Sequence, residues 1–413
     1  MMLQKLSSLQ DAQAMYDWFA QMRATQPVWL DEESDCWHVF RYDDVLHVAT
    51  DYATFSSERR PQDLRRFNTR SGQAPSLLAM DPPQHRQYRN LVSPSFTLRA
   101  LAPLSGRIQV IVQELLDVVR PKGCMDLIAD LAYPLPTTVI AELLGVPATD
   151  RPVFKRWADA LFARQLNDVD LFHAEASELE RRPDFQRAKQ ATMEMEAYFE
   201  RELEERRHAP CEDLMSELLA AEVEGERLTG DELLSFCILL LLAGHVTTTN
   251  LLGNAMLCLD EHPDQMEKLR AEPELTASAV EEVLRYASPV WRLTRRPKNA
   301  VEIGGKTIPA NAVVFAWLAS ANRDEEQFPD PTHFDVARTP NKHVAFGHGI
   351  HFCVGAPLAR MEASIALPML LAQLPHLRRE RGAPLEMLTS SFLFGVKKLP
   401  VTFSASIPLQ TGV

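Results

Sequence analysis

The sequence lacks every arrangement of cysteines that would build a disulfide framework or a structural zinc site. Its six cysteines are widely scattered and none belongs to a Cys-x-x-Cys pair, which is typical of a protein in a reducing compartment. The N-terminus has no signal-peptide core, and the most apolar internal run, residues 233–244, is too short to span a bilayer. We therefore expect a cytoplasmic protein without a membrane anchor.

Positive charge and nucleotide-binding loops are also scarce. The 43 basic residues are outnumbered by 56 acidic residues, which gives a net charge of −13 and a field that disfavours nucleic acid. Gly304 and Gly305 fit a hairpin turn rather than a phosphate-binding loop, and no flavin or nicotinamide fingerprint is present. If the chain carries out redox chemistry, its electrons must come from separate proteins.

What is present is a mostly helical pattern with short β-segments. Spacing and capping residues predict helices at residues 11–25, 43–49, 84–92, 101–119, 128–144, 151–164, 184–207, 229–262, 276–286 and 356–374. Alternation predicts strands at 29–40 and 301–318 and a hairpin at 390–403, with a meander at 322–341; residues 166–182 fit no single element. We expect a mainly α fold with small β-sheets, as one domain over residues 1–413 with a β-rich lobe near 28–60, 290–320 and 385–405.

The loop from Phe346 to Gly355 is the most informative segment. It reads Phe-x-x-Gly-x-His-x-Cys-x-Gly and places Cys353 directly before a predicted helix. Unpaired N–H groups and the positive end of a helix dipole favour a negative sulfur, and glycines allow close backbone approach. A lone cysteine is more often a small core residue, but this spacing favours a thiolate offered to a metal ion.

Three further patterns are ambiguous when each is taken alone. Glu282 and Arg285 lie three residues apart on one helical face, as an ordinary surface ion pair would. His85 and Arg89 lie four apart and form either a solvated basic face or a clamp for a carboxylate. Gly244 weakens a long apolar helix beside three threonines, which suits a polar helix crossing or a small ligand.

Together the four patterns have the order and spacing of the cytochromes P450, and the chain resembles this family from about residue 10 to 405. The resemblance implies a P450 fold, haem b with Cys353 as the iron ligand, and a structural role for Glu282, Arg285 and Arg338. It implies a haem-thiolate monooxygenase that hydroxylates or epoxidises a hydrophobic small molecule with dioxygen. The implied haem contacts are His85, Arg89, Arg295, Phe346, Gly347, His351 and Gly355, with Arg296 as the neighbouring competitor of Arg295.

On the oxygen side, the resemblance assigns Ala243, Gly244 and Thr247 to the segment above the haem. The sequence departs from the family at Val246, where an acid usually helps to bring protons in. Three explanations follow: water, His245 or a substrate hydroxyl delivers protons; turnover is slow and leaks peroxide; or peroxide is the oxidant. No arginine that could hold a substrate carboxylate stands in this segment, which favours the first two.

The resemblance also places an apolar substrate pocket opposite the cysteine loop. Its expected lining is Leu239, Ala243, Val290, Trp291, Leu293, Leu393 and Phe394, under a roof from residues 58–79 and 161–187. The nature of the substrate stays open among fatty acids, terpenoids, steroids and polyketides.

A ferredoxin and its reductase are the expected electron donors, and we expect a monomer. Candidate basic residues for ferredoxin docking are Arg99, Lys342, His343 and Arg360. Two alternatives remain. One is a peroxide-driven oxidase of the same fold. The other is a haem-binding sensor or carrier, which Val246 favours and which Thr247 and an apolar pocket oppose.

Overall fold

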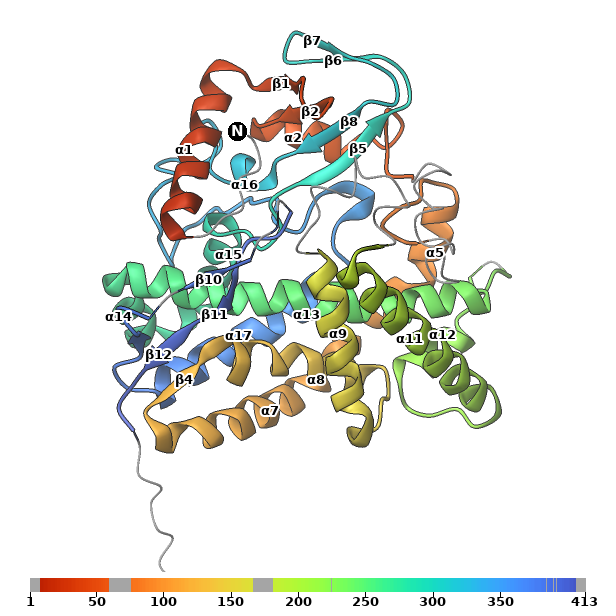
Figure 1. Cartoon of the computed structure of the whole chain (residues 1–413), viewed down its shortest axis with the longest axis vertical. Helices are drawn as coiled ribbons and strands as arrows, with labels where there is room; N and C mark the ends of the chain where they lie inside the picture. The colour runs from red at the N-terminus through yellow and green to blue at the C-terminus, as the bar shows by residue number, and fades with distance from the viewer. Residues whose placement is uncertain are drawn as a thin grey trace, which may run out of the picture.

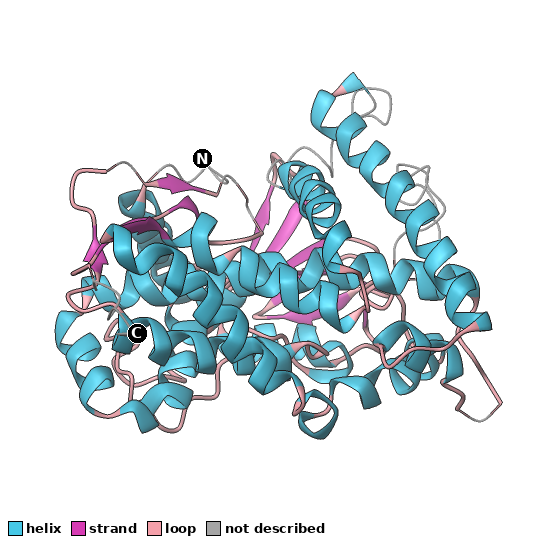
Figure 2. Cartoon of the chain, turned by 90° about the horizontal axis from the view of Figure 1, so that it is seen from below, coloured by secondary structure: helices cyan, strands magenta, loops and turns pink. Residues whose placement is uncertain are grey.

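The computed structural model describes residues 8–58, 76–165, 181–223, 225–383, 385–388, 390 and 392–405. Helices make up most of these residues, with short strands between them (Figure 2). The α-helices are α1 (Leu9–Thr25), α2 (Tyr42–Thr50), α5 (Gln84–Val92), α6 (Leu98–Leu101), α7 (Leu104–Val119), α8 (Pro134–Leu143), α9 (Arg151–Gln165), α11 (Pro183–His208), α12 (Leu214–Ala220), α13 (Gly230–Glu261), α14 (Pro263–Ala271), α15 (Thr276–Tyr286), α16 (Leu318–Ala321) and α17 (Ala356–Gln373).

The long helix α13 forms the centre of the molecule. Figure 1 shows it crossing the middle of the fold, with α7, α8 and α17 on one side and a sheet on the other. Its start is fixed by a capping box, because Thr229 and Glu232 exchange side-chain and backbone hydrogen bonds. The helix is long and apolar enough to cross a bilayer, but 72% of its most apolar window is buried within the protein, as in the core helix of a soluble fold.

The largest sheet lies beside α1 and α2 and has the order β1-β2-β8-β5-β3. Its strands come from two distant parts of the chain: β1 (Val28–Asp31), β2 (Cys36–Val39), β3 (Phe55–Ser56), β5 (Leu293–Pro297) and β8 (Val313–Ala316). Between the last two, β6 (Val301–Ile303) and β7 (Lys306–Ile308) form the expected hairpin. Its turn uses Gly304 and Gly305 at φ values of 53° and 72°, where glycine avoids the strain of a side chain.

The predicted hairpin at residues 390–403 is wrong in its pairing. Strand β11 (Val396–Lys398) pairs with β10 (Glu386–Met387), whereas β12 (Pro400–Thr402) pairs with β4 (Cys124–Asp126) and β9 (Arg378–Arg379). None of these five strands joins the sheet beside α1. Residues 392–394 instead bond to residues 289–291, directly before β5, through an isolated antiparallel bridge between Val290 and Leu393.

Several helix boundaries also differ from the predictions. The predicted helix at 101–119 is interrupted before Leu104 by Pro103, and that at 128–144 is a π-turn over Ile128–Ala132 followed by α8. Helices α12 and α14 were not predicted; Pro263 ends α13 and also occupies the first position of α14, which proline tolerates. Most of the expected roof, residues 59–75 and 166–180, lies outside the described residues.

Candidate active site

The cysteine loop presents the sulfur of Cys353 at the start of α17. The Cys353 N–H donates to the carbonyl of Phe346 at 2.9 Å, which closes the loop. Gly347 and Gly349 have φ values near +70°, and a Cβ at Gly349 would lie 3.0 Å from the Cα of Thr50. A side chain at Gly349 would therefore be both strained and crowded.

Some neighbours of the Cys353 sulfur oppose ionisation of the thiol, and others favour it. Burial raises the pKa of the Cys353 thiol, while N–H groups of Gly355 and Ala356 and the cations Arg89 and Arg360 lower it. Cys353 is nevertheless accessible to solvent. The Cys353 residue thus keeps contact with solvent although protein atoms surround its thiol.

Four basic side chains from three segments meet beside this loop. The rings of His85 on α5 and His351 in the loop lie 4.2 Å apart. Burial, followed by the nearby charges of Arg295 and His85, lowers the pKa of His351 to about 3. Burial also lowers the pKa values of His85 and Arg89, and that of Arg295 to about 10. Burial is the largest cause of each shift, so the charged forms of this basic cluster are disfavoured in the protein alone.

The four basic side chains do not use all of their hydrogen-bonding atoms. The Nε2 atoms of His85 and His351 are buried and have no hydrogen-bond partner. Arg295 donates to the carbonyl of Thr294 at 2.9 Å, and Arg89 donates to the hydroxyl of Ser93 at 3.1 Å. Since buried polar atoms are nearly always paired in native proteins, this cluster is suited to an anionic ligand.

The side chains of Arg295 and Arg296 point in different directions. Arg295 is buried, and its charge acts on both histidines. Arg296, the next residue of β5, donates instead to the carbonyl of Asn311 in an exposed position. Alternate residues of a strand point to opposite faces, so only Arg295 belongs to the cluster.

Glu282, Arg285 and Arg338 form a buried ionic trio behind the cysteine loop. Arg285 makes two hydrogen bonds of 2.8 Å to Glu282, and Arg338 adds a third of 3.1 Å. Both arginines also donate to carbonyls of residues 329–333 in the meander. The trio thus ties α15 to the meander that leads into the loop. Glu282 offsets one of the two positive charges, and the remaining guanidinium donors bond to backbone carbonyls.

In the middle of α13, one face of the helix is open. Ala243 is exposed and Thr247 is half-buried, although most residues around them are buried. The Thr247 hydroxyl donates to the carbonyl of Ala243 at 2.8 Å. Gly244 permits close packing against α8, since a Cβ there would lie 2.7 Å from Cδ1 of Ile140.

His245 and Val246 are placed differently from their neighbours. His245 is fully buried, its Nδ1 atom bonds to the carbonyl of Leu241, and its ring packs against Tyr133 at 5.5 Å. On a helix, His245 is turned away from the face that Ala243 and Thr247 share. This position argues against His245 as a proton carrier for that face. Val246 is buried against Leu388 and Leu393.

The expected pocket residues fall into two groups. Leu239, Val290 and Leu293 are only partly buried, and Leu293 approaches the cysteine loop, 3.9 Å from the Cβ position of Gly347. Trp291 and Phe394 stack on each other at 5.0 Å and pack against Tyr16, while Leu393 packs against Val246. These contacts place Trp291, Leu393 and Phe394 in the core; apolar residues of either kind look alike in a sequence.

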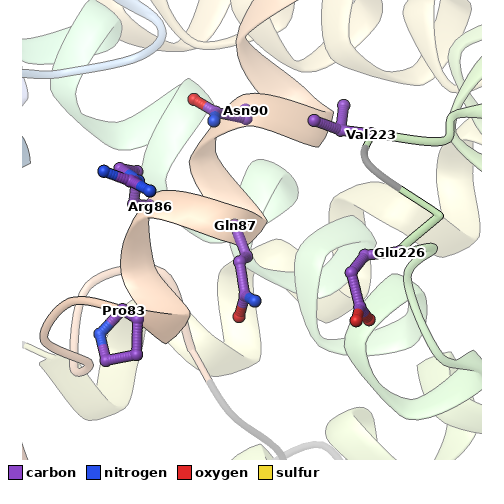
Figure 3. A pocket seen from close by; sticks show the side chains of 6 residues that line it. All are labelled: Pro83, Arg86, Gln87, Asn90, Val223 and Glu226. Carbon is purple, nitrogen blue, oxygen red and sulfur yellow. The ribbon is translucent and has the colours of Figure 1, made fainter.

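A separate surface groove of about 430 Å³ lies on the other side of α5. It is lined by Pro83, Arg86, Gln87 and Asn90 from the start and outer face of the helix and by Val223 and Glu226 (Figure 3). Its lining is mostly polar, and neither His85 nor Arg89 belongs to it. This groove is therefore not the expected apolar substrate pocket.

A helical fold that holds an exposed cysteine in a glycine loop, a basic cluster and an open helix face has the features of a haem-thiolate protein. The family model of the cytochromes P450 matches residues 13–403, and the chain belongs to this family. It is a monooxygenase that inserts oxygen from dioxygen into hydrophobic small molecules, with electrons from separate redox partners.

Relatives of known reaction and structure support this assignment. The chain is 40% identical to cyclomarin C epoxidase CymV of Salinispora arenicola, over 96% of this chain and 98% of that one. It is 38% identical to erythromycin C-12 hydroxylase of Saccharopolyspora erythraea, over 99% of both chains. Substrate-free CYP109E1 of Bacillus megaterium superposes with a TM-score of 0.87 at 42% identity, over 95% of this chain and 99% of that one.

Proposed function

We propose that the enzyme binds haem b through Cys353 and that His85, Arg89, Arg295 and His351 hold the two haem carboxylates. The two buried, unpartnered Nε2 atoms of the histidines carry this proposal. Carboxylate oxygens would accept hydrogen bonds from both rings and would neutralise the two arginines. The basic cluster and the family's haem cofactor are therefore chemically matched.

When bound, a haem with a cysteinate ligand favours cleavage of the O–O bond of dioxygen. The chain's own contribution begins with holding the sulfur as an anion. N–H groups of Gly355 and Ala356 and the cations Arg89 and Arg360 stabilise the Cys353 thiolate. The turn at Gly347 and the ring of Phe346 keep the loop close to the helix that supplies these N–H groups.

On the opposite side, we assign Ala243, Gly244 and Thr247 to the oxygen pocket. The Thr247 hydroxyl is held one helical turn away by the Ala243 carbonyl, so it is oriented on the open face. Val246 offers no exchangeable proton, and His245 faces Tyr133. We propose that water or a substrate hydroxyl delivers protons to Thr247 in place of the usual acid.

The substrate side is assigned to Leu239, Val290 and Leu293, with Ala243 from the open face. These residues offer an apolar surface near Thr247 and the cysteine loop, which suits a hydrophobic substrate. Crystal structures of CYP109E1 from Bacillus megaterium include complexes with testosterone and corticosterone, so a steroid is a rational first probe. We further propose a cytoplasmic monomer that receives electrons from a ferredoxin and its reductase.

The decisive experiment is Cys353→Ala, with Cys211→Ala as the matched control because Cys211 is an exposed cysteine elsewhere. The reduced carbon monoxide complex of the wild type and of Cys211→Ala should show the absorption band that gives the family its name. Cys353→Ala should lose it, and an unchanged band would refute Cys353 as the ligand. A haem spin-state titration with steroids then tests the pocket.

A further inference from the structure

Two adjacent glutamates of α15 point to different partners. Glu282 holds Arg285 and Arg338, whereas Glu281 faces α17 and binds Arg360. Arg360 makes two hydrogen bonds to the two carboxylate oxygens of Glu281, at 2.7 and 2.8 Å. This bidentate geometry fixes a guanidinium far better than a single contact does.

His343 completes the setting of this pair. Its Nδ1 atom accepts from the N–H of Ala345 at 3.2 Å, so its Nε2 atom is the donor to Glu281 at 2.9 Å. Although Glu281 is partly buried, hydrogen bonds from Arg360 and His343 hold its pKa at about 2. The Glu281 carboxylate is therefore ionised at neutral pH and stays in an ion pair with Arg360.

The held cation lies against the cysteine loop. The Arg360 guanidinium sits over the ring of Phe346, 4.6 Å from its centroid, and the Phe346 carbonyl accepts from Cys353. Arg360 is also among the charges that act on the Cys353 sulfur. A cation fixed at this place stabilises additional negative charge on the sulfur and on any metal that the sulfur binds.

We propose that the Glu281–Arg360 pair sets the reduction potential of the haem, with Arg360 as a positioning and tuning residue rather than a catalytic one. This inference rests on the proposed haem ligation by Cys353. The positive charge of Arg360 favours the reduced state, and Glu281 limits this effect while keeping the guanidinium on Phe346. The pair thus links α15 electrostatically to the proposed haem, which accepts the electrons.

The test is a potentiometric titration of the purified holoenzyme and four variants. Arg360→Met should move the potential to a more negative value, because it removes the positive charge beside Phe346 and leaves the Glu281 carboxylate bound only by His343. At a fixed potential the ratio of reduced to oxidised haem should fall up to about tenfold, which converts to ~59 mV for one electron. Glu281→Gln should move the potential in the opposite direction, and the double variant should return close to the wild type. Arg360→Lys, which keeps the charge, should restore most of the wild-type value.

The control is Arg207→Met, which removes an arginine from an exposed ion pair with Glu204 on α11 and should leave the potential unchanged. If Arg360→Met and Glu281→Gln both keep the wild-type potential, the proposal is overturned. An altered rate of reduction by a ferredoxin at unchanged potential would also overturn it, and would make Arg360 a docking contact. A missing carbon monoxide band in the wild type would instead overturn the haem ligation by Cys353. If Arg360→Met does not retain haem, the potential of Glu281→Gln decides the proposal. A shift to a more positive potential supports it, and no shift or a negative shift overturns it.

Discussion

Replacing Glu282 by Gln should destabilise the enzyme strongly, because it removes the only negative charge of the buried trio. The Glu282 carboxylate accepts from Arg285, Arg338, the Asp335 N–H and the Asn341 side chain. Neither Glu282 nor Arg285 is exposed to solvent. Glutamine keeps the shape, but its amide nitrogen must face an arginine that is itself a donor.

The magnitude follows from the burial of the trio. Removing one partner of a buried ion pair costs about 3–5 kcal/mol. With an unfolding entropy of ~2.1 cal/mol/K per residue, the 413 residues give about 0.9 kcal/mol/K. The melting temperature should therefore fall by about 3–6 °C.

Calorimetry of wild type, Glu282→Gln and the exposed-pair control Glu204→Gln measures this difference. The control should melt with the wild type, because exposed ion pairs contribute little. A Glu282→Gln variant with the wild-type melting temperature would refute the reasoning that the trio's charges must compensate one another. Loss of haem from the same variant would show that the trio also supports the cysteine loop.

Further predictions concern the oxygen side and the acid range. Thr247→Ala should release more peroxide per reductant consumed, while Thr247→Ser should behave as the wild type; equal leakage in both would remove Thr247 from oxygen handling. Val246→Glu should increase the yield of product per reductant relative to the isosteric Val246→Gln, at some loss of stability because Leu388 and Leu393 surround the site. Equal yields would show that protons already arrive by another route. The depressed pKa of Glu281 contributes stability above its ordinary value of 4.5, and this stability is lost as the pH falls towards about 2. Melting curves against pH should therefore be flatter in this range for Glu281→Gln, and identical slopes would contradict the contribution.

Local signals in the sequence predicted the helices better than the strand pairing. The capping box at Thr229 and the glycine before Ala356 mark the starts of α13 and α17 through contacts within a few residues. The pairing of β12 with β4 depends on residues that are 276 positions apart, such as Val401 and Met125. No short-range pattern carries that information.

The site shows the same division between local and distant information. Spacing within the motifs singled out Cys353, His85 and the Glu282–Arg285 pair as candidates, since each belongs to one loop or one helix face. The bond between Glu281 and Arg360 joins residues 79 positions apart, and the sequence offered Arg360 only as a surface cation. The burial of Trp291 and Phe394 could not be predicted from the sequence either, because an apolar side chain suits a core and a pocket alike.

The close contact between Gly244 and Ile140 has a consequence for engineering the enzyme. The position of α13 over the active site depends on the bulk of a residue on α8, whose side chain packs behind the helix. Shortening Ile140 would give α13 room to shift, so the reaction chamber could be reshaped from outside. Libraries aimed at new substrates should therefore include this supporting position alongside the lining residues.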